Sequence, residues 1–229
     1  MVAIDGREIE VRFRRHNRAR RLIVRLDRKG EAVTVTLPPR ASRKEALAFV
    51  DRSRTWIAGR LERQPQAIAF APGSEILLRG TVHVIIHEPG RRGLVGTASQ
   101  PARILVPGDA AHFKRRLTDW LKREAKRDLL AASDRHARSM RVTFRKLSIR
   151  DQASRWGSCS ADGSLSYSWR LVLAPPHVLD YVAVHEVAHL KHMNHSMRFW
   201  RLVLAHCPHA AEARDWLRRH GASLHRYGV

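Results

Sequence analysis

Cysteine, lysine and long apolar runs are scarce in this chain of 229 residues. It has only two cysteines, Cys159 and Cys207, which excludes a disulfide framework and favours a reducing compartment. No stretch approaches the roughly 18 uncharged apolar residues of a membrane-spanning helix. The first residues lack a basic segment followed by an apolar one, so we expect no signal peptide and a cytoplasmic location.

Acidic residues are also few, and the resulting positive charge is unevenly placed. The chain holds 43 Lys and Arg against 21 Asp and Glu, a formal net charge of +22, and only seven of the 43 are lysine. Residues 151–229 hold nine basic and six acidic residues, so +19 of the charge lies in residues 1–150, whereas nine of the 14 histidines follow residue 150. A hydrophobic content of 44% excludes a disordered chain, and the basic half raises the question of an anionic partner.

The N-terminal half is predicted to be mostly strand with one helix. Strands are expected over residues 7–13, 21–26, 32–37, 76–78, 82–86 and 104–106, where short apolar or alternating runs end at turn residues. Ser42 and Glu45 form a capping box that begins the helix, which should end before Pro65. Pro107-Gly108 is the predicted boundary of this domain.

The rest of the chain is predicted to be rich in helix. Residues 110–138 carry an apolar stripe opposite Lys and Arg, which indicates one long amphipathic helix. Strands are expected around residues 142–150 and 164–173, and helices over about 176–192, 197–206 and 210–219. The sequence shows no internal repeat. We therefore predict an α+β chain with a β-rich domain over residues 1–108 and a second domain over 109–229.

The helix after Pro176 contains His185-Glu186-Val187-Ala188-His189, an HExxH motif. Residues four apart lie about 40° apart around a helix axis, so both imidazoles face one point and can share one Zn²⁺. Glu186 lies beside them and can accept a proton from a water without being a ligand. Apolar neighbours bury this helix, where unpaired His and Glu side chains would be costly. The motif therefore predicts a metal site rather than a pair of core histidines.

A catalytic zinc needs a third protein ligand, and two histidines compete for this role. His195 follows His189 by six residues, so the chain must leave the helix and fold back to bring it near. Asn194 can make that turn in the left-handed conformation, and Ser196 can cap the next helix. His192 shares the helical face but lies about 10 Å along the axis from the first ligand. We therefore expect His195 to complete a site for one Zn²⁺ per chain.

Two parts of the sequence resemble the bacterial YgjP-like metallopeptidases. The matching residues are Asp180 to Leu190, Asn194-His195-Ser196, Phe199-Trp200, Ser154 to Ser160, Trp169-Arg170-Leu171 and Ala174-Pro175. This family is similar to the WLM and SprT-like proteases of the zincin group. The resemblance implies a minimal zincin-type catalytic domain, with the HExxH helix packed on a small sheet and a long support helix. It also implies a zinc peptidase with ligands His185, His189 and His195 and with Glu186 as the base.

Other residues near the motifs each have two interpretations. Arg155 and Trp156 either border a cleft in which their strand pairs with an extended peptide, or are a solvated arginine and a tryptophan of the sheet core. In the first case Arg155 can stabilise an oxyanion. Asp180 is expected in the first helical turn rather than behind a ligand histidine. Phe199-Trp200 is expected to pack behind the site.

The predicted activity is hydrolysis of peptide bonds in a protein or peptide substrate by a zinc-activated water, with Glu186 as general base. One alternative is a DNA-associated protease that docks on nucleic acid through the basic N-terminal half. Another is a basic nucleic-acid-binding protein with a structural zinc site, although no nucleic-acid-binding signature and no fourth ligand of suitable spacing are evident. The physiological substrate and the oligomeric state are not predicted.

Overall fold

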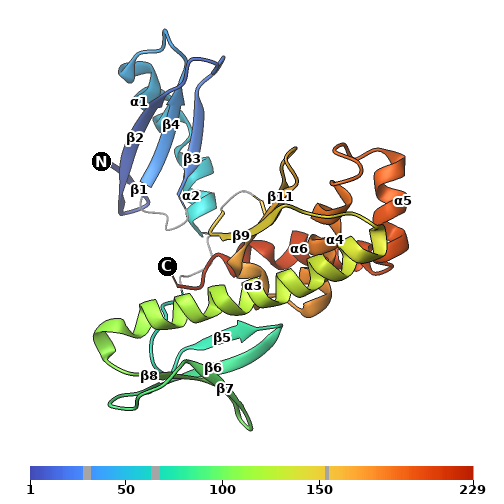
Figure 1. Ribbon diagram of the computed structural model, residues 1–229. Coiled ribbons are helices and arrows are strands. Elements are labelled where there is room, and N and C mark those ends of the chain that lie inside the picture. The colour runs from blue at the N-terminus through green and yellow to red at the C-terminus, as the bar shows by residue number, and fades with distance from the viewer. Residues whose placement is uncertain (28–31, 63–67, 153–154, 229) are drawn as a thin grey trace. The chain divides into compact units, whose positions relative to one another are not determined.

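The computed structural model describes residues 1–27, 32–62, 68–152 and 155–228, and the chain divides into two compact units, Met1–Ala67 and Ile68–Val229 (Figure 1). The domain boundary predicted from the sequence, near Pro107-Gly108, lies inside the second unit. The difference has a physical reason, because the strands before residue 108 share one core with the helices after it. Ile85 and Ile104 belong to the same buried cluster as Leu117.

The first unit is a four-stranded sheet followed by two short helices. The strands are β1 (Val2–Ile4), β2 (Arg7–Arg15), β3 (Ile23–Leu26) and β4 (Ala32–Leu37), in the order β1-β2-β4-β3 with β2 and β4 parallel. Helix α1 (Arg43–Arg52) begins at the predicted capping box of Ser42 and Glu45. The single predicted helix is interrupted at Ser53, after which α2 (Arg54–Glu62) follows. The predicted stop at Pro65 lies outside the described residues.

The second unit begins with the same sheet topology. Its strands are β5 (Glu75–Leu78), β6 (Thr81–Glu88), β7 (Gly96–Ser99) and β8 (Ala102–Pro107), in the order β5-β6-β8-β7 with β6 and β8 parallel. In each unit the first two strands are joined by two residues of positive φ, Asp5-Gly6 and Arg79-Gly80, as a type I′ hairpin turn requires. A helix then follows each sheet. The units therefore repeat a topology that the sequence did not reveal, because few residues besides the turn glycine are shared.

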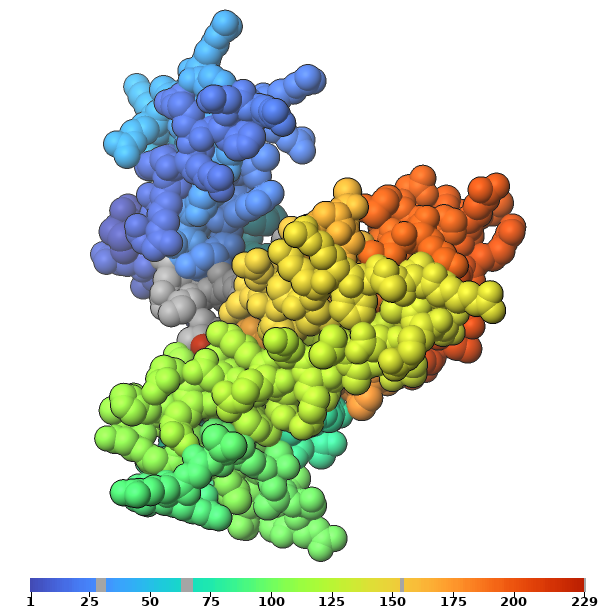
Figure 2. Space-filling view, viewed as in Figure 1, coloured from blue at the N-terminus to red at the C-terminus, as the bar shows by residue number. Residues whose placement is uncertain are grey.

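A long helix and a three-stranded sheet come next. Helix α3 (Phe113–Met140) follows a 3-10 turn, η1 (Ala110–His112), and one side of this helix lies at the surface of the second unit, as Figure 2 shows. The strands β9 (Lys146–Arg150), β10 (Gly157–Cys159) and β11 (Ser164–Ser168) are arranged in the order β10-β11-β9. The predicted strand over residues 164–173 is correct only to Ser168, because a 3-10 helix, η2 (Trp169–Leu173), follows.

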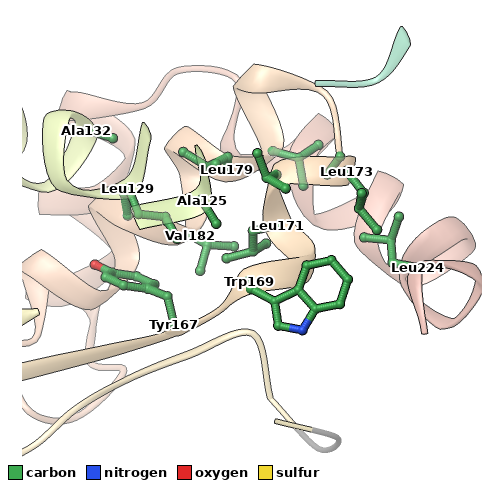
Figure 3. Close-up of a cluster of buried hydrophobic side chains, with 14 of the residues drawn as sticks. Ala125, Leu129, Ala132, Tyr167, Trp169, Leu171, Leu173, Leu179, Val182 and Leu224 are labelled. Atoms are coloured by element: carbon green, nitrogen blue, oxygen red, sulfur yellow. The ribbon is translucent and has the colours of Figure 1, made fainter. Parts of the chain in front are cut away.

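Three helices complete the second unit, namely α4 (Pro176–Ala188), α5 (Met197–His206) and α6 (Ala210–Leu224). Helix α6 continues to Leu224, beyond its predicted end at residue 219. Figure 3 shows side chains of α3, η2, α4 and α6 converging on one core that includes Leu129, Leu171, Val182 and Leu224. This core fixes α4, and with it the HExxH motif, between the long helix and the small sheet.

The predicted α+β fold class is confirmed. Small mixed sheets alternate with helices in both units, and the N-terminal unit is built around a sheet as expected. Among the described residues, no helix combines the length and the apolar character needed to cross a bilayer.

Candidate metal centre

Three imidazoles, those of His185, His189 and His195, converge at the C-terminal end of α4. Their ring centroids lie 5.0, 5.0 and 4.8 Å apart, and one nitrogen of each lies within 4.8 Å of the others. The Nε2 atoms of His185 and His195 are 3.1 Å apart. Two ligands of a tetrahedral zinc ion are separated by roughly 3.4 Å, given Zn–N distances of about 2.0–2.1 Å. The donor set and its spacing therefore fit zinc.

The chain folds back between the second and third histidines, as the motif spacing required. Beyond α4, the amides of Leu190 and Lys191 donate to carbonyls three residues earlier, so the helix tightens before it ends. Asn194 is not among the described residues with positive φ, so the predicted left-handed turn at this position is wrong. Ser196 caps α5 as predicted by accepting a hydrogen bond from the amide of Phe199.

A backbone carbonyl orients the second histidine. Nδ1 of His189 lies 3.0 Å from the carbonyl oxygen of His192. Because a carbonyl can only accept, Nδ1 donates its proton and Nε2 keeps a free lone pair for a metal. His192 therefore supports the site through its backbone, and its ring is not part of the converging group. From the sequence, only the ring of His192 was a candidate for the site.

Aromatic side chains form the floor of the site, as expected for Phe199-Trp200. Phe199 is fully buried, and its ring centroid lies 4.6–4.9 Å from those of all three histidines. Trp200 stacks on His195 at 5.8 Å and receives the guanidinium of Arg214 on its ring. Nδ1 of His185 is buried without a hydrogen-bond partner among the described residues, so packing holds this ring in place.

Burial keeps the imidazoles of His185 and His189 neutral. Desolvation, with the charges of His189, His195 and Arg214, lowers the pKa of His185 to about 4. Desolvation also lowers the pKa of His189, although the hydrogen bond to the His192 carbonyl acts to raise it. Neutral imidazole is the form that binds a metal, so these two side chains are ready to bind at neutral pH.

Glu186 is 6% exposed and packs against strand β10. A Cβ atom on Gly157 would lie 2.6 Å from both Cγ and Oε1 of Glu186, so only glycine leaves room for this side chain. The amide of Cys159 donates a hydrogen bond to the carboxylate. Burial raises the pKa of Glu186 to about 7, while the charge of Arg155 and the Cys159 amide act to lower it. Gly157 and Cys159 contact Glu186 but were not predicted as site residues. The segment Ser154 to Ser160 that contains them was noted only for its resemblance to the family.

Arg155 and Trp156, the two candidate substrate-binding residues, directly precede β10, the edge strand of its sheet. Their surroundings differ. Arg155 precedes the strand and is exposed near Glu186, while Ser154 lies outside the described residues. Trp156 instead turns to α6. Its ring stacks on His225 with centroids 5.0 Å apart, and a Cβ on Gly221 would lie 3.1 Å from it. The packing favours a structural role for Trp156 and leaves Arg155 available to a substrate.

Asp180 is neither a first-turn residue of α4 nor a partner of a ligand histidine, the two roles considered from the sequence. It is the fifth residue of α4, beyond the first turn, and its partners are Arg135 and His136 of α3 rather than a ligand histidine. Burial acts to raise the pKa of Asp180, but the hydrogen bond and charge of His136, with Arg135, lower it below its ordinary value. The carboxylate is thus ionised at neutral pH and joins α3 to α4.

One comparison identifies a related group of proteins. A family model described as "YgjP-like, metallopeptidase domain" matches residues 20–220. No curated protein and no solved structure matches the chain significantly. The matched span covers most of both units and includes Glu186, strand β10 and all three converging histidines.

Proposed function

Because the chain belongs to the YgjP-like metallopeptidase family, we propose that it is a zinc-dependent peptidase acting on a protein or peptide substrate. His185, His189 and His195 would hold one zinc ion, and Glu186 would act as the general base. The observation that carries this proposal is the convergence of three imidazoles beside a buried carboxylate. Three protein ligands leave a fourth position of a tetrahedral ion for water and substrate.

In the proposed reaction, the bound zinc, Glu186 and Arg155 each have a separate role. When bound, zinc supplies a Lewis acid that polarises the scissile carbonyl and acidifies water. Glu186 accepts a proton from the attacking water and passes it to the leaving amine. Its buried position raises its pKa and suits it to both steps. Arg155, which is exposed near Glu186, would stabilise the negative charge that develops on the carbonyl oxygen.

The free edge of β10 offers a place for the substrate. The carbonyl of Trp156 accepts from the amide of Ser168, and the amide of Ser160 donates to Ser164, so the even-numbered residues of this segment pair with β11. The backbone groups of Gly157 and Cys159 consequently point away from β11, where the Cys159 amide already donates to Glu186. An extended peptide can add to this edge as a further strand, which would bring its backbone next to Glu186.

The proposal is tested by casein hydrolysis with and without metal. We expect the purified protein to cleave casein, a chelator to abolish cleavage, and added Zn²⁺ to restore it. Arg155→Ala should lower kcat by about 10²-fold with a smaller effect on KM, in the range seen when one oxyanion donor is lost. Activity that survives complete removal of zinc would contradict the proposal.

Nucleic-acid docking through the first unit is a second candidate, because that unit combines charge with an exposed aromatic groove. Residues 1–67 hold 17 Lys and Arg against eight Asp and Glu. An open groove of about 600 Å³ is lined by Arg21, Leu22, Ile23, Val24, Phe49, Ser53 and Trp56. Trp56 is 52% exposed. An aromatic ring beside arginine is the usual platform for an unpaired base, so single-stranded nucleic acid is the expected ligand.

This second candidate is tested with a labelled single-stranded oligonucleotide and fluorescence anisotropy. We expect binding that weakens with salt, and a loss of about 1–3 kcal/mol in affinity for Trp56→Ala, equal to one stacked base. Leu47→Ala, on an exposed side chain of α1 outside the groove, is the matched control. No binding at physiological salt would remove this candidate and leave the peptidase proposal intact.

A further inference from the structure

A second group of side chains that could bind a metal lies on a different face of α4 from the three histidines. Asp180 precedes His185 by five residues, which places it about 140° around the helix axis. Cys207 and His209 come from the connection between α5 and α6. One donor atom each of Asp180, Cys207 and His209 lies within 4.8 Å of the others. The fold therefore brings a carboxylate, a thiol and an imidazole together at a place that the catalytic proposal does not use.

Several polar atoms of this cluster lack partners. Nε2 of His209 and Nε2 of His177 are inaccessible to solvent and make no hydrogen bond within the described part of the chain. His209 Nε2 is 3.8 Å from Oδ2 of Asp180, beyond hydrogen-bond range. The thiol of Cys207 is fully buried, and no described residue forms a hydrogen bond with it. Buried polar groups are normally paired, so the unpaired His209 nitrogen and the buried Cys207 thiol beside Asp180 call for a ligand, and the unpaired nitrogen of neighbouring His177 is consistent with one.

The carboxylate is already oriented for such a ligand. Oδ1 of Asp180 accepts hydrogen bonds from Nε2 of His136, at 2.7 Å, and from Arg135. Its other oxygen, Oδ2, is left facing His209. Outer partners of this kind fix the ligand carboxylates of metal sites. A simple ion pair between Asp180 and His209 would explain neither the buried thiol nor the unpaired nitrogen of His177.

We propose that Asp180, Cys207 and His209 bind a second metal ion of the zinc class, with His177 on the same helix as a candidate fourth donor. Thiolate, imidazole and carboxylate together select zinc over the hard cations magnesium and calcium. His177 precedes Asp180 by one helical turn, and its ring centroid lies 6.0 Å from that of His209. The donors would have to draw together, since tetrahedral ligands are separated by about 3.5 Å.

Binding would release one proton. Burial, together with the negative charge of Asp180, raises the pKa of the Cys207 thiol to about 11, so the thiol keeps its proton at neutral pH. The cation replaces that proton, which passes to solvent, and forms the metal–sulfur bond. The ion would tie the α5–α6 connection to α4, the helix that carries the HExxH motif. Its role is therefore structural, and it does not depend on the proposed peptidase activity.

Cobalt provides the most selective probe, because a cobalt–thiolate bond gives an intense near-ultraviolet charge-transfer band that a site of three histidines cannot give. We expect Co²⁺ added to the metal-free full-length protein, kept reduced without added thiols, to produce this band. Cys207→Ala should abolish it, while Cys159→Ala, the matched control at the other cysteine, should leave it unchanged. A band that is absent, or unaffected by Cys207→Ala, would overturn the proposal.

Zinc content separates this site from the catalytic one. The wild-type protein should bind about two zinc ions per chain, and Cys207→Ala and His189→Ala should each bind about one. If Cys207→Ala fails to fold, His209→Ala at a partly exposed side chain should weaken cobalt binding at this site by more than about tenfold. One zinc ion that is lost in His189→Ala but kept in the Cys207 and His209 variants would refute the second site alone. Retention of both ions in His189→Ala would refute the catalytic ligand set instead.

Discussion

A glycine is required at position 157 because the side chain of Glu186 occupies the space of a Cβ atom. We expect Gly157→Ala to displace the carboxylate and to lower kcat by about a hundredfold, the cost of a misplacement of about 1 Å. Zinc content should not change, because the three atoms nearest to the added Cβ all belong to Glu186, which is not a proposed ligand. Gly96→Ala, where a Cβ meets nothing within 4 Å, is the control for casein hydrolysis. A Gly157→Ala variant with wild-type kcat would show that Glu186 does not need its present position.

Trp156 illustrates how a motif residue can serve packing instead of substrate. Its ring lies between His225 and the backbone of Gly221, on the last helix of the chain. Trp156→Ala should lower the free energy of unfolding by about 2–4 kcal/mol, somewhat less than a fully buried tryptophan would cost. Trp156→Phe should recover most of this loss in urea denaturation, and KM for casein should stay near the wild-type value. A large rise in KM without a loss of stability would restore the substrate-binding interpretation.

At the scale of elements, the β10–β11 hairpin is held at its turn by Asp162. The carboxylate accepts hydrogen bonds from Ser160, Ser164 and Arg145. These bonds, that of Ser160 first, keep the pKa of Asp162 well below its ordinary value. A depressed carboxyl pKa stabilises the fold above the unfolded pKa, near 4, and this stabilisation is lost as pH falls toward the folded value.

The corresponding prediction concerns Asp162→Asn. The variant should be less stable than the wild type at pH 7, and the difference in unfolding free energy should shrink as pH falls below about 4. Urea denaturation of both proteins at neutral and acid pH measures it. A difference that stays constant down to pH 3 would mean that Asp162 is not the group that stabilises the turn.

The elements also show what the sequence can and cannot predict. The HExxH helix, its successor and the caps at Ser42 and Ser196 follow from residue spacing and side-chain chemistry, which act locally. Strand β10 escaped prediction because Gly157 to Cys159 is too short to show alternation, and its pairing with β11 is a tertiary contact. The apolar run from Trp169 to Leu173 has no period that separates a buried strand from a 3-10 helix. Strand β10 supplies the residues that contact Glu186. The sequence therefore predicted the candidate metal ligands but not the residues that surround the general base.

For the whole molecule, the two units have separate buried clusters, and the candidate active site lies entirely in the second. A fragment of residues 68–229 should therefore fold, bind zinc and cleave casein. A fragment of residues 109–229 should aggregate, because removal of β5–β8 exposes Phe113, Leu117 and Trp120 of α3. Circular dichroism and zinc content distinguish the two outcomes. An active, soluble 109–229 fragment would instead support the boundary at residue 108.

The central claim is that Glu186 acts as the base of a zinc peptidase whose ligands are three histidines. The most direct test is Glu186→Gln, which keeps the shape of the side chain and removes the proton acceptor. We predict that this variant binds zinc at the catalytic site as the wild type does and loses casein hydrolysis by about 10²- to 10⁴-fold, the usual contribution of a general base. Casein cleavage by Glu186→Gln at the wild-type rate would contradict the account.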